Sequence, residues 1–287
     1  MKSVCLTAFL ILMGAAEAFS QSPRGGVRSL FGSDLANSLP RADSVPVSVT
    51  GVVNGASFQP GIAAGSWVTI QGSNLANTNP GRIWKAEEIV NGNLPTSLDG
   101  VSVMINNKPA YVYYISPTQI NVQAPSDGSV GPVNVVVTNN GSVSPAGTAQ
   151  LQAFSPAFFQ YGGTSYAIAT RFPDNALLGN PASIPGTVAA KPGDVLILWA
   201  TGFGPTNPAV SAGVVVTGAP AATTAPTITL ANSMNANVIG TALSPGSAGL
   251  YQIAIQLPGN VPTGNVAIQA SVGGVQSAAG INLFVGN

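Results

Sequence analysis

The sequence predicts an all-β protein made of two tandem immunoglobulin-like β-sandwich domains. Two observations predict this fold: one stretch occurs twice, and Val, Ile and Thr are abundant between closely spaced Gly, Pro and Asn turns. Residues 115–125 align with residues 248–258 without a gap. Gln119, Ile120, Gln123 and Pro125 recur 133 residues later, as Gln252, Ile253, Gln256 and Pro258. A repeat of this length indicates a duplicated domain, because solenoid repeats are only about 20 to 50 residues long.

Each copy of the repeated stretch alternates apolar and polar residues. In the first copy Ile120, Val122 and Ala124 alternate with Gln119, Asn121 and Gln123; in the second, Ile253, Ile255 and Leu257 alternate with Gln252, Ala254 and Gln256. Successive side chains of a strand point to opposite faces, so both copies are predicted strands with one apolar and one polar face. Further along, Asn140-Gly141 and Gly273-Gly274 supply the residues that a two-residue hairpin turn requires.

The chain divides into four predicted segments. Residues 1–18 have the features of a secretory signal peptide, with Lys2, an apolar stretch and the cleavage pattern Ala16-Glu17-Ala18. Residues 19–44 are a predicted flexible leader, residues 45–153 the first sandwich and residues 154–287 the second. Cys5, the single cysteine, lies in the signal peptide, so the mature chain is expected to lack disulfides.

Further elements follow from the pattern in each domain. In the first we expect strands over 46–53 and 66–71, a long insert over 76–94, and a hairpin formed by 101–105 and 108–115. In the second we expect an extra hairpin over 158–171, a strand over 194–201, a loop or irregular edge strand over 207–226, and strands over 227–230, 235–243 and 275–285. Residues 153–154 join the domains without a Gly/Ser linker, which predicts limited freedom between them.

Composition narrows the function classes. Only 6% of the 287 residues are charged, against about 25% in an average protein, and the formal net charge is zero. The basic patch of a nucleic-acid-binding protein is therefore missing. After residue 18, no apolar run reaches the roughly 18 residues of a spanning helix, so no membrane span is expected in the mature chain. A surface rich in Asn, Gln, Ser and Thr favours an extracellular protein.

Catalytic and metal-binding residue types are scarce. The chain has no histidine, so neither a Ser-His-Asp triad nor a Cys-His pair can form, and His- or Cys-based metal sites are excluded as well. The aspartates are spread singly, which disfavours a calcium loop. We expect no catalytic residue, metal or cofactor. A carboxylate-based glycoside hydrolase using Glu87 or Glu88 with Asp174 stays open as a second alternative.

Aromatic residues give the candidate ligand surface. Trp67 and Trp199 lie in corresponding strands; core packing is predicted for Trp199 and partial exposure for Trp67. Trp84, in the polar insert, and the tyrosines of residues 111–114 are further candidates for stacking on a sugar or docking a protein. The candidate residues are Trp67, Trp84, Tyr111, Tyr113 and Tyr114.

Several separate motifs carry a family resemblance over residue 45 to the end. They are residues 53–58 (VNGASF), 64–75 (AGSWVTIQGSNL), 94–103 (LPTSLDGVSV), 114–125 (YISPTQINVQAP), 191–195 (KPGDV) and 200–205 (ATGFGP). In these motifs the chain resembles a family of C-terminal domains of secreted acidobacterial proteins, related to the IPT/TIG immunoglobulin-like fold. The resemblance implies a secreted pair of Ig-like sandwiches and transfers no catalytic residues. Family members usually close a longer protein, whereas here a signal peptide and a short leader precede the domains.

The favoured interpretation is a secreted or cell-surface, non-catalytic Ig-like protein that acts in adhesion or recognition, alone or as an accessory module. The expected partner is an extracellular protein or polysaccharide. The alternative is a carbohydrate-binding module. No oligomeric state follows from the sequence.

Overall fold

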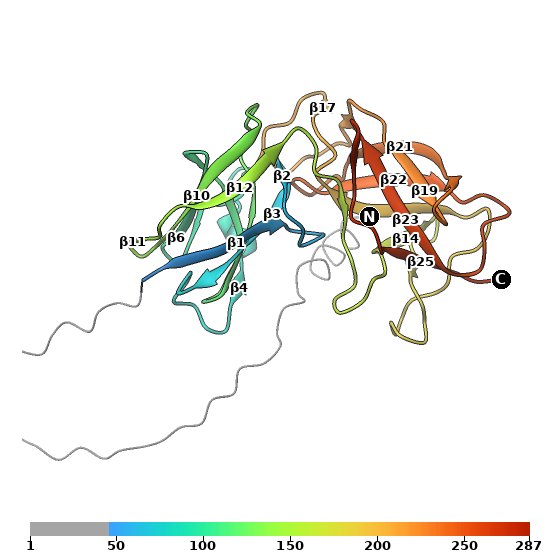
Figure 1. Cartoon of the computed structure of the whole chain (residues 1–287), viewed down its shortest axis with the longest axis horizontal. Coiled ribbons are helices and arrows are strands. Elements are labelled where there is room, and N and C mark those ends of the chain that lie inside the picture. Colours follow the sequence, from blue (N-terminus) through green and yellow to red (C-terminus); the bar gives the residue numbers. More distant parts are fainter. Residues whose placement is uncertain (1–45) are drawn as a thin grey trace, which may run out of the picture.

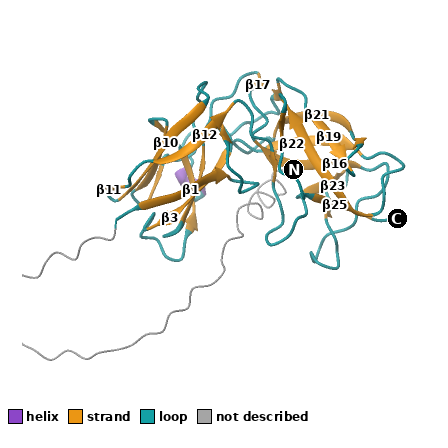
Figure 2. Cartoon of the chain, viewed as in Figure 1, coloured by secondary structure: helices purple, strands orange, loops and turns teal. Residues whose placement is uncertain are grey.

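The structure, a computed structural model, describes residues 46–287. The predicted signal peptide and leader lie outside the described residues. Two β-sandwiches lie side by side (Figure 1), and strands and loops form nearly all of both (Figure 2). The one helical element named among residues 46–287 is a short 3-10 turn, η1 (Ala86–Glu88). This architecture confirms the predicted all-β class and the tandem Ig-like sandwiches.

The first sandwich consists of two sheets. One sheet has the strand order β1-β3-β9-β8-β4, with β1 (Ser48–Asn54), β3 (Trp67–Ser73), β9 (Gln119–Gln123), β8 (Tyr111–Ile115) and β4 (Arg82–Ile83). The facing sheet has the order β2-β12-β10-β6-β5, with β2 (Ile62–Ala63), β12 (Gly147–Gln152), β10 (Gly131–Asn139), β6 (Val101–Ile105) and β5 (Ser97–Leu98); β11 (Ser142–Val143) and β7 (Lys108–Pro109) pair at its margins.

The second sandwich has the same plan with extra edge strands. Its larger sheet has the order β15-β14-β16-β22-β21-β18-β17, with β15 (Leu177–Leu178), β14 (Ala169–Phe172), β16 (Val195–Thr201), β22 (Tyr251–Gln256), β21 (Asn237–Leu243), β18 (Ala221–Ala222) and β17 (Thr206–Asn207); β13 (Ala157–Phe158) pairs with β16. The facing sheet has the order β20-β19-β23-β24, with β20 (Met234–Asn235), β19 (Thr227–Leu230), β23 (Gly264–Val272) and β24 (Val275–Gln276); β25 (Asn282–Val285) pairs with β23.

The repeated stretch forms equivalent strands in the two sandwiches. Ile120 of β9 pairs with Ile70, and Ile253 of β22 pairs with Leu198 in the corresponding neighbour strand. Strands β10 and β23 begin and end 133 residues apart, which is the offset of the sequence repeat. The repeated segments of the sequence therefore form the same strand pairing in both sandwiches.

Each sandwich encloses its own apolar core, built from the inward positions of the alternating strands. The first core includes Ile70, Val103, Ile120, Val122 and Val135, and the second includes Leu196, Leu198, Ile253, Ile255 and Ile268. Both predicted hairpin turns are confirmed, because Asn140, Gly141, Gly273 and Gly274 all have positive φ angles, between 47° and 86°.

One expectation for the first domain is wrong. Residues 101–105 and 108–115 do not form one hairpin: β6 pairs with β7 over four residues, after which the chain crosses to the other sheet and β8 pairs with β9 and β4. The insert over residues 76–94 contributes β4 and η1. β4 is ordered by pairing with β8, a strand remote from it in the sequence, which local pattern does not reveal.

Candidate ligand site at the domain junction

The two sandwiches share a third apolar cluster, which lies between them. Trp67 and Tyr113 of the first domain pack there with Phe159, Tyr161 and Trp199 of the second. Trp84 completes an aromatic trio with Trp67 and Tyr113, whose ring centroids are 4.6 to 6.0 Å apart with mostly edge-on geometry. This junction cluster brings side chains of both domains into direct contact.

The structure corrects the expected exposure of two candidate residues. Trp67 is 0% exposed and Tyr113 is 2% exposed. The Trp67 backbone N–H donates to Thr201 Oγ1 at 3.0 Å, and its indole Nε1 donates to the Ala248 carbonyl at 3.1 Å, so both contacts cross the junction. Trp67 does lie on the polar face of its strand, in phase with Thr69, but the second domain covers that face. These two side chains do not form an exposed ligand surface.

The other aromatic candidates are half-buried at the margin of the junction. The Trp84 backbone N–H donates to the Tyr113 carbonyl at 2.9 Å, which holds Trp84 beside the cluster. The Tyr111 ring lies so close to Gly213 that a Cβ there would be 2.1 Å from the ring, and Tyr114 lies equally tightly against Gly81. Trp199 is buried, as predicted, although it packs in the junction cluster rather than in the core of its own sandwich.

A segment of the second domain, residues 211–216, pairs with the first domain through backbone hydrogen bonds; we call it the junction arm. The Leu94 N–H donates to the Gly213 carbonyl at 2.8 Å, and the Val215 N–H donates to the Gly92 carbonyl at 2.8 Å. The predicted loop over residues 207–226 thus contains an inter-domain strand contact. Backbone pairing of this kind sets the orientation of the arm as well as its position.

Gln123, from the repeated motif, links the arm to the first domain. Its Oε1 accepts a hydrogen bond from the Gly213 N–H at 2.8 Å, and its Nε2 donates to the Gly65 carbonyl at 3.0 Å. Ser126 Oγ accepts from the Ala212 N–H at 2.9 Å. A polar side chain that the alternation assigned to solvent is therefore buried and satisfied by main-chain groups of both domains.

Asn54 makes a second polar link at the junction. Its Nδ2 donates to the carbonyl and the hydroxyl oxygen of Ser155, at 2.9 and 3.0 Å. Its Oδ1 accepts from the backbone N–H of Ala56 at 2.9 Å, which stabilises the turn after β1. No sequence signal distinguished Asn54 from an ordinary turn asparagine, since its partner lies 101 residues away.

A cleft of about 370 Å³ opens at the junction beside Gln123 and the arm. Residues of both domains line it, including Gln123, Ser129 and Val130 from the first and Thr206, Ser211 and Tyr251 from the second. Small residues such as Gly65, Gly128, Gly204 and Gly249 leave main-chain groups close to its surface. Domain interfaces are among the places where ligand pockets of this size occur preferentially, and sequence reasoning did not identify this one.

The carboxylate in this cleft is already paired. The Asp127 carboxylate accepts hydrogen bonds from the Ser129 backbone N–H at 3.0 Å and from Asn106 Nδ2 at 2.7 Å, and it lies 3.2 Å from Lys108 Nζ. The Ser129 backbone hydrogen bond, followed by that of Asn106, holds the pKa of Asp127 well below its usual range. The cleft consequently offers hydroxyl, amide and apolar groups to a ligand, and its one carboxylate stays ionised and engaged.

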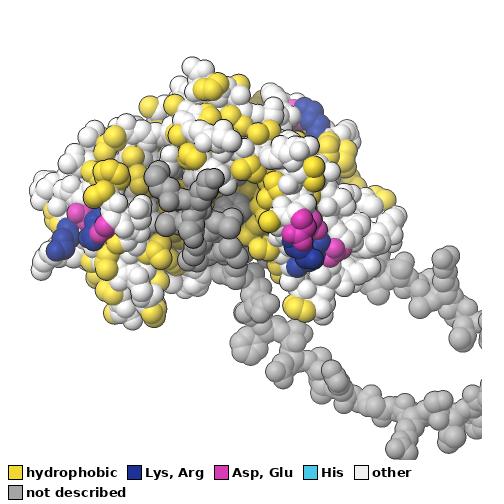
Figure 3. All heavy atoms as spheres, turned by 180° about the vertical axis from the view of Figure 1, so that it is seen from behind, with side chains coloured by type: hydrophobic (Ala, Val, Ile, Leu, Met, Phe, Trp, Pro, Cys, Tyr) yellow, Lys and Arg dark blue, Asp and Glu magenta, His cyan; other side chains and the backbone are white. Residues whose placement is uncertain are grey.

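Two carboxylates of the hydrolase alternative, Glu88 and Asp174, are held in separate ion pairs, and Glu87 is exposed. Arg82 bonds both oxygens of Glu88, at 2.9 Å each, and also bonds Asp99. The Arg82 hydrogen bond lowers the pKa of Glu88, whereas a glycosidase acid needs a raised pKa. Asp174 pairs with Arg171 in the second domain, which lowers its pKa as well. Figure 3 shows charged side chains in a few small groups, separated by uncharged and hydrophobic surface.

Residues 46–287 contain no group of three or more His, Cys, Asp or Glu side chains placed to hold a metal ion. No helix among them has the length and apolar character needed to cross a bilayer.

The sheets and their junction define a tandem pair of immunoglobulin-like β-sandwich domains. Residues 52–161 match the family model of the IPT/TIG domain, so the match runs from within β1 through the rest of the first sandwich and β13 of the second. Comparison with curated proteins finds no match.

Solved structures with similarity to the chain come from several surface proteins. The surface glycan-binding protein PbSGBP-B of Prevotella bryantii is 12% identical with a TM-score of 0.25, covering 82% of this chain and 41% of that one. The mixed-linkage glucan locus protein SGBP-B of Bacteroides ovatus, in complex with a mixed-linkage heptasaccharide, is 10% identical with a TM-score of 0.32, covering 86% and 47%. The plexin A4 extracellular region is 11% identical with a TM-score of 0.26, covering 89% and 20%. The chain spans less than half the length of each.

Proposed function

We propose that this chain is a non-catalytic recognition protein, which acts outside the cell or on its surface by binding a segment of an extracellular protein in the junction cleft. The observation that carries the proposal is that the cleft is assembled from both domains and held by main-chain hydrogen bonds across the junction. A preorganised site loses little conformational entropy on binding, so its contacts contribute more fully to affinity.

The cleft lining supports a protein segment with small or apolar side chains. Val130 is 71% exposed at its rim and offers an apolar contact. Ser129 and Ser211 offer hydroxyl groups, and nearby glycines expose main-chain groups, which suit hydrogen bonding to a peptide backbone. Since Asp127 is already paired, the site favours an uncharged segment.

Binding is tested with two matched variants. Val130→Glu places a charge at the rim of the cleft, while Val143→Glu changes another exposed valine, in β11, which does not line the cleft. An extracellular protein captured by the wild type should then bind the purified chain directly. Its Kd should rise about tenfold or more with Val130→Glu and stay unchanged with Val143→Glu. Equal binding by both variants, or no saturable binding by any extracellular protein, would remove the proposal.

Export is proposed with the recognition function. The pattern Ala16-Glu17-Ala18 and the likeness to domains of secreted acidobacterial proteins support it. The mature protein, isolated from the producing cells, should begin at Phe19 and be found outside the cytoplasm. A cytoplasmic protein that retains Met1 would contradict export without affecting the cleft.

A further inference from the structure

A second, smaller hollow lies at the junction, toward the opposite end of β9 from the cleft. Gln123 lines the cleft, whereas Gln119 and Asn121 line the hollow. Its volume is about 170 Å³, and its other walls are the turn around Phe58 in the first domain and residues 159–164 in the second. The two cavities share no lining residue, so they are separate sites.

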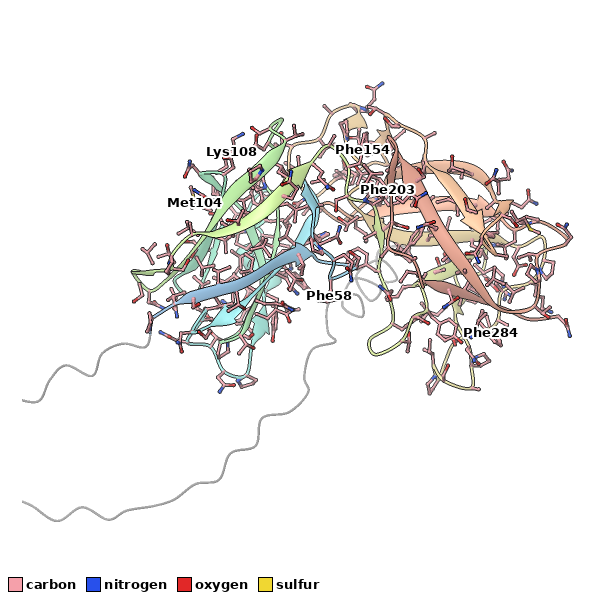
Figure 4. The ribbon with its side chains drawn as sticks, viewed as in Figure 1. Phe58, Met104, Lys108, Phe154, Phe203 and Phe284 are labelled. Carbon is pink, nitrogen blue, oxygen red and sulfur yellow. The ribbon has the colours of Figure 1, made fainter. Side chains whose placement is uncertain are left out.

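Phe58 presents an aromatic ring at this hollow. Its side chain is exposed, with 48% of the residue accessible, although large apolar residues are usually covered. The turn that carries it is fixed, because the Phe58 N–H donates to the Asn54 carbonyl at 2.9 Å and Asn54 is anchored to Ser155 of the second domain. Figure 4 places Phe58 on the side of the first domain that faces the second. The ring is therefore held in a defined position beside the hollow.

The polar groups of the hollow are amides and a hydroxyl. Gln119 and Gln160 are half-buried; Gln119 Nε2 donates to Asn121 Oδ1 at 2.9 Å, and Gln160 Nε2 makes a long contact of 3.4 Å to the Ala56 carbonyl. Tyr161 is buried, and its hydroxyl has no hydrogen-bond partner among residues 46–287. A buried hydroxyl without a partner is uncommon in folded proteins and calls for a ligand or water to satisfy it. No charged residue lines the hollow.

We propose that this hollow binds a neutral sugar residue of an extracellular glycan. A sugar ring has an apolar C–H face, which suits the Phe58 ring, and a rim of hydroxyl groups, which suit the side-chain amides of Gln119 and Gln160 and the Tyr161 hydroxyl. An anionic ligand would find no cation in the lining, and a purely apolar ligand would leave the amides unpaired. The site is separate from the junction cleft, so either proposal can fail while the other holds.

Three variants of the full chain test this inference, each checked for an unchanged unfolding midpoint. Phe58→Ala removes the ring, Tyr161→Phe removes only the unpartnered hydroxyl, and Phe172→Ala is the control because Phe172 is an exposed phenylalanine outside the hollow. Each protein is titrated calorimetrically with neutral gluco-, manno-, galacto- and N-acetylglucosamine oligosaccharides, with an acidic oligogalacturonate, and with a proline-rich peptide.

We expect at least one neutral oligosaccharide to bind the wild type. Its Kd should rise about tenfold with Phe58→Ala and about threefold to tenfold with Tyr161→Phe, and should not change with Phe172→Ala. Binding that is insensitive to Phe58→Ala and Tyr161→Phe would overturn the inference. So would a preference for the acidic oligosaccharide or the peptide, or the absence of binding by every neutral sugar at concentrations of about 10 mM.

Discussion

Tyr113 and Ile239 occupy the same β-bulge in the two halves of the duplicated fold. In the first domain Tyr113 is the extra residue between Val112, which pairs with Val122, and Tyr114, which pairs with Asn121. In the second, Ile239 is the extra residue between Val238, which pairs with Ile255, and Gly240. Tyr113 is buried in the junction cluster, whereas Ile239 is 56% exposed. One backbone irregularity thus serves an interface in one copy and faces solvent in the other.

This pair predicts unequal effects of one substitution. Tyr113→Ala should lower the free energy of unfolding by about 3–5 kcal/mol, because it removes a buried ring that contacts Trp67 and Trp84. Ile239→Ala should cost less than about 1 kcal/mol, since its side chain is largely solvated. Urea unfolding of both variants measures the difference, and equal losses would show that Tyr113 does not stabilise the junction.

Gln123 and its repeat counterpart Gln256 provide a second matched pair. Gln123→Ala should cost about 1–3 kcal/mol, because the Gly213 N–H and the Gly65 carbonyl lose their partner in a buried setting. Gln256→Ala should be nearly neutral, because Gln256 is exposed. Hydrogen exchange at the Gly213 amide should accelerate with Gln123→Ala alone; unchanged exchange would mean that the arm is held by other contacts.

Alanine substitutions at Gly213 and Gly274 distinguish the cost of backbone strain from the cost of a steric clash. Both have a φ angle of 81°, so replacing either with alanine should cost about 1–2 kcal/mol from the left-handed conformation. A Cβ at Gly213 would also clash with the Tyr111 ring, whereas one at Gly274 meets nothing within 4 Å. Gly213→Ala should therefore cost about 1–3 kcal/mol more and speed exchange at the Leu94 amide, which donates to Gly213. Equal unfolding midpoints for the two variants would contradict the tight contact.

The ion-pair group around Arg82 predicts an acid-sensitive contribution to stability. The Arg82 hydrogen bond lowers the pKa of Asp99 to about 2, below its unfolded value of about 3.9. A carboxylate with a lowered folded-state pKa stabilises the fold above the unfolded pKa, and this contribution is lost as the pH falls from about 4 to about 2. In Asp99→Asn the unfolding midpoint should depend less on pH in that window, while Glu87→Gln, an exposed neighbour, should behave as the wild type. Parallel curves for the wild type and Asp99→Asn would refute the assignment.

Much of the fold could be predicted because strands and turns depend mainly on residues close together in the sequence. Ile120, Ile253 and the turn at Asn140-Gly141 lie as the pattern indicates, since period two and positive φ depend on near neighbours. The candidate site could not be predicted in the same way. The alternation predicts that Gln123 faces solvent. Its side-chain amide is instead hydrogen-bonded to main-chain groups that tertiary packing brings together.

The burial of Trp67 and Tyr113 could not be predicted, for a related reason. Trp67 lies in phase with polar residues, and sequence alternation cannot tell a face covered by another domain from one covered by water. Tyr113 sits in a bulge, where the alternation itself shifts by one residue. Phe58 carried no sequence signal, because its exposure depends on the turn fixed by Asn54 and Ser155.

The junction cluster also has a consequence for separating the two sandwiches from each other. Trp67 and Trp199 come from different sandwiches, and each is sheltered by residues that the other sandwich contributes. A hybrid protein that contained only one of the sandwiches would expose the apolar side chains of the junction cluster. They would stay exposed unless the other part of the hybrid covered them with a complementary aromatic surface. The two sandwiches are thus better regarded as one structural unit than as two independent, interchangeable domains.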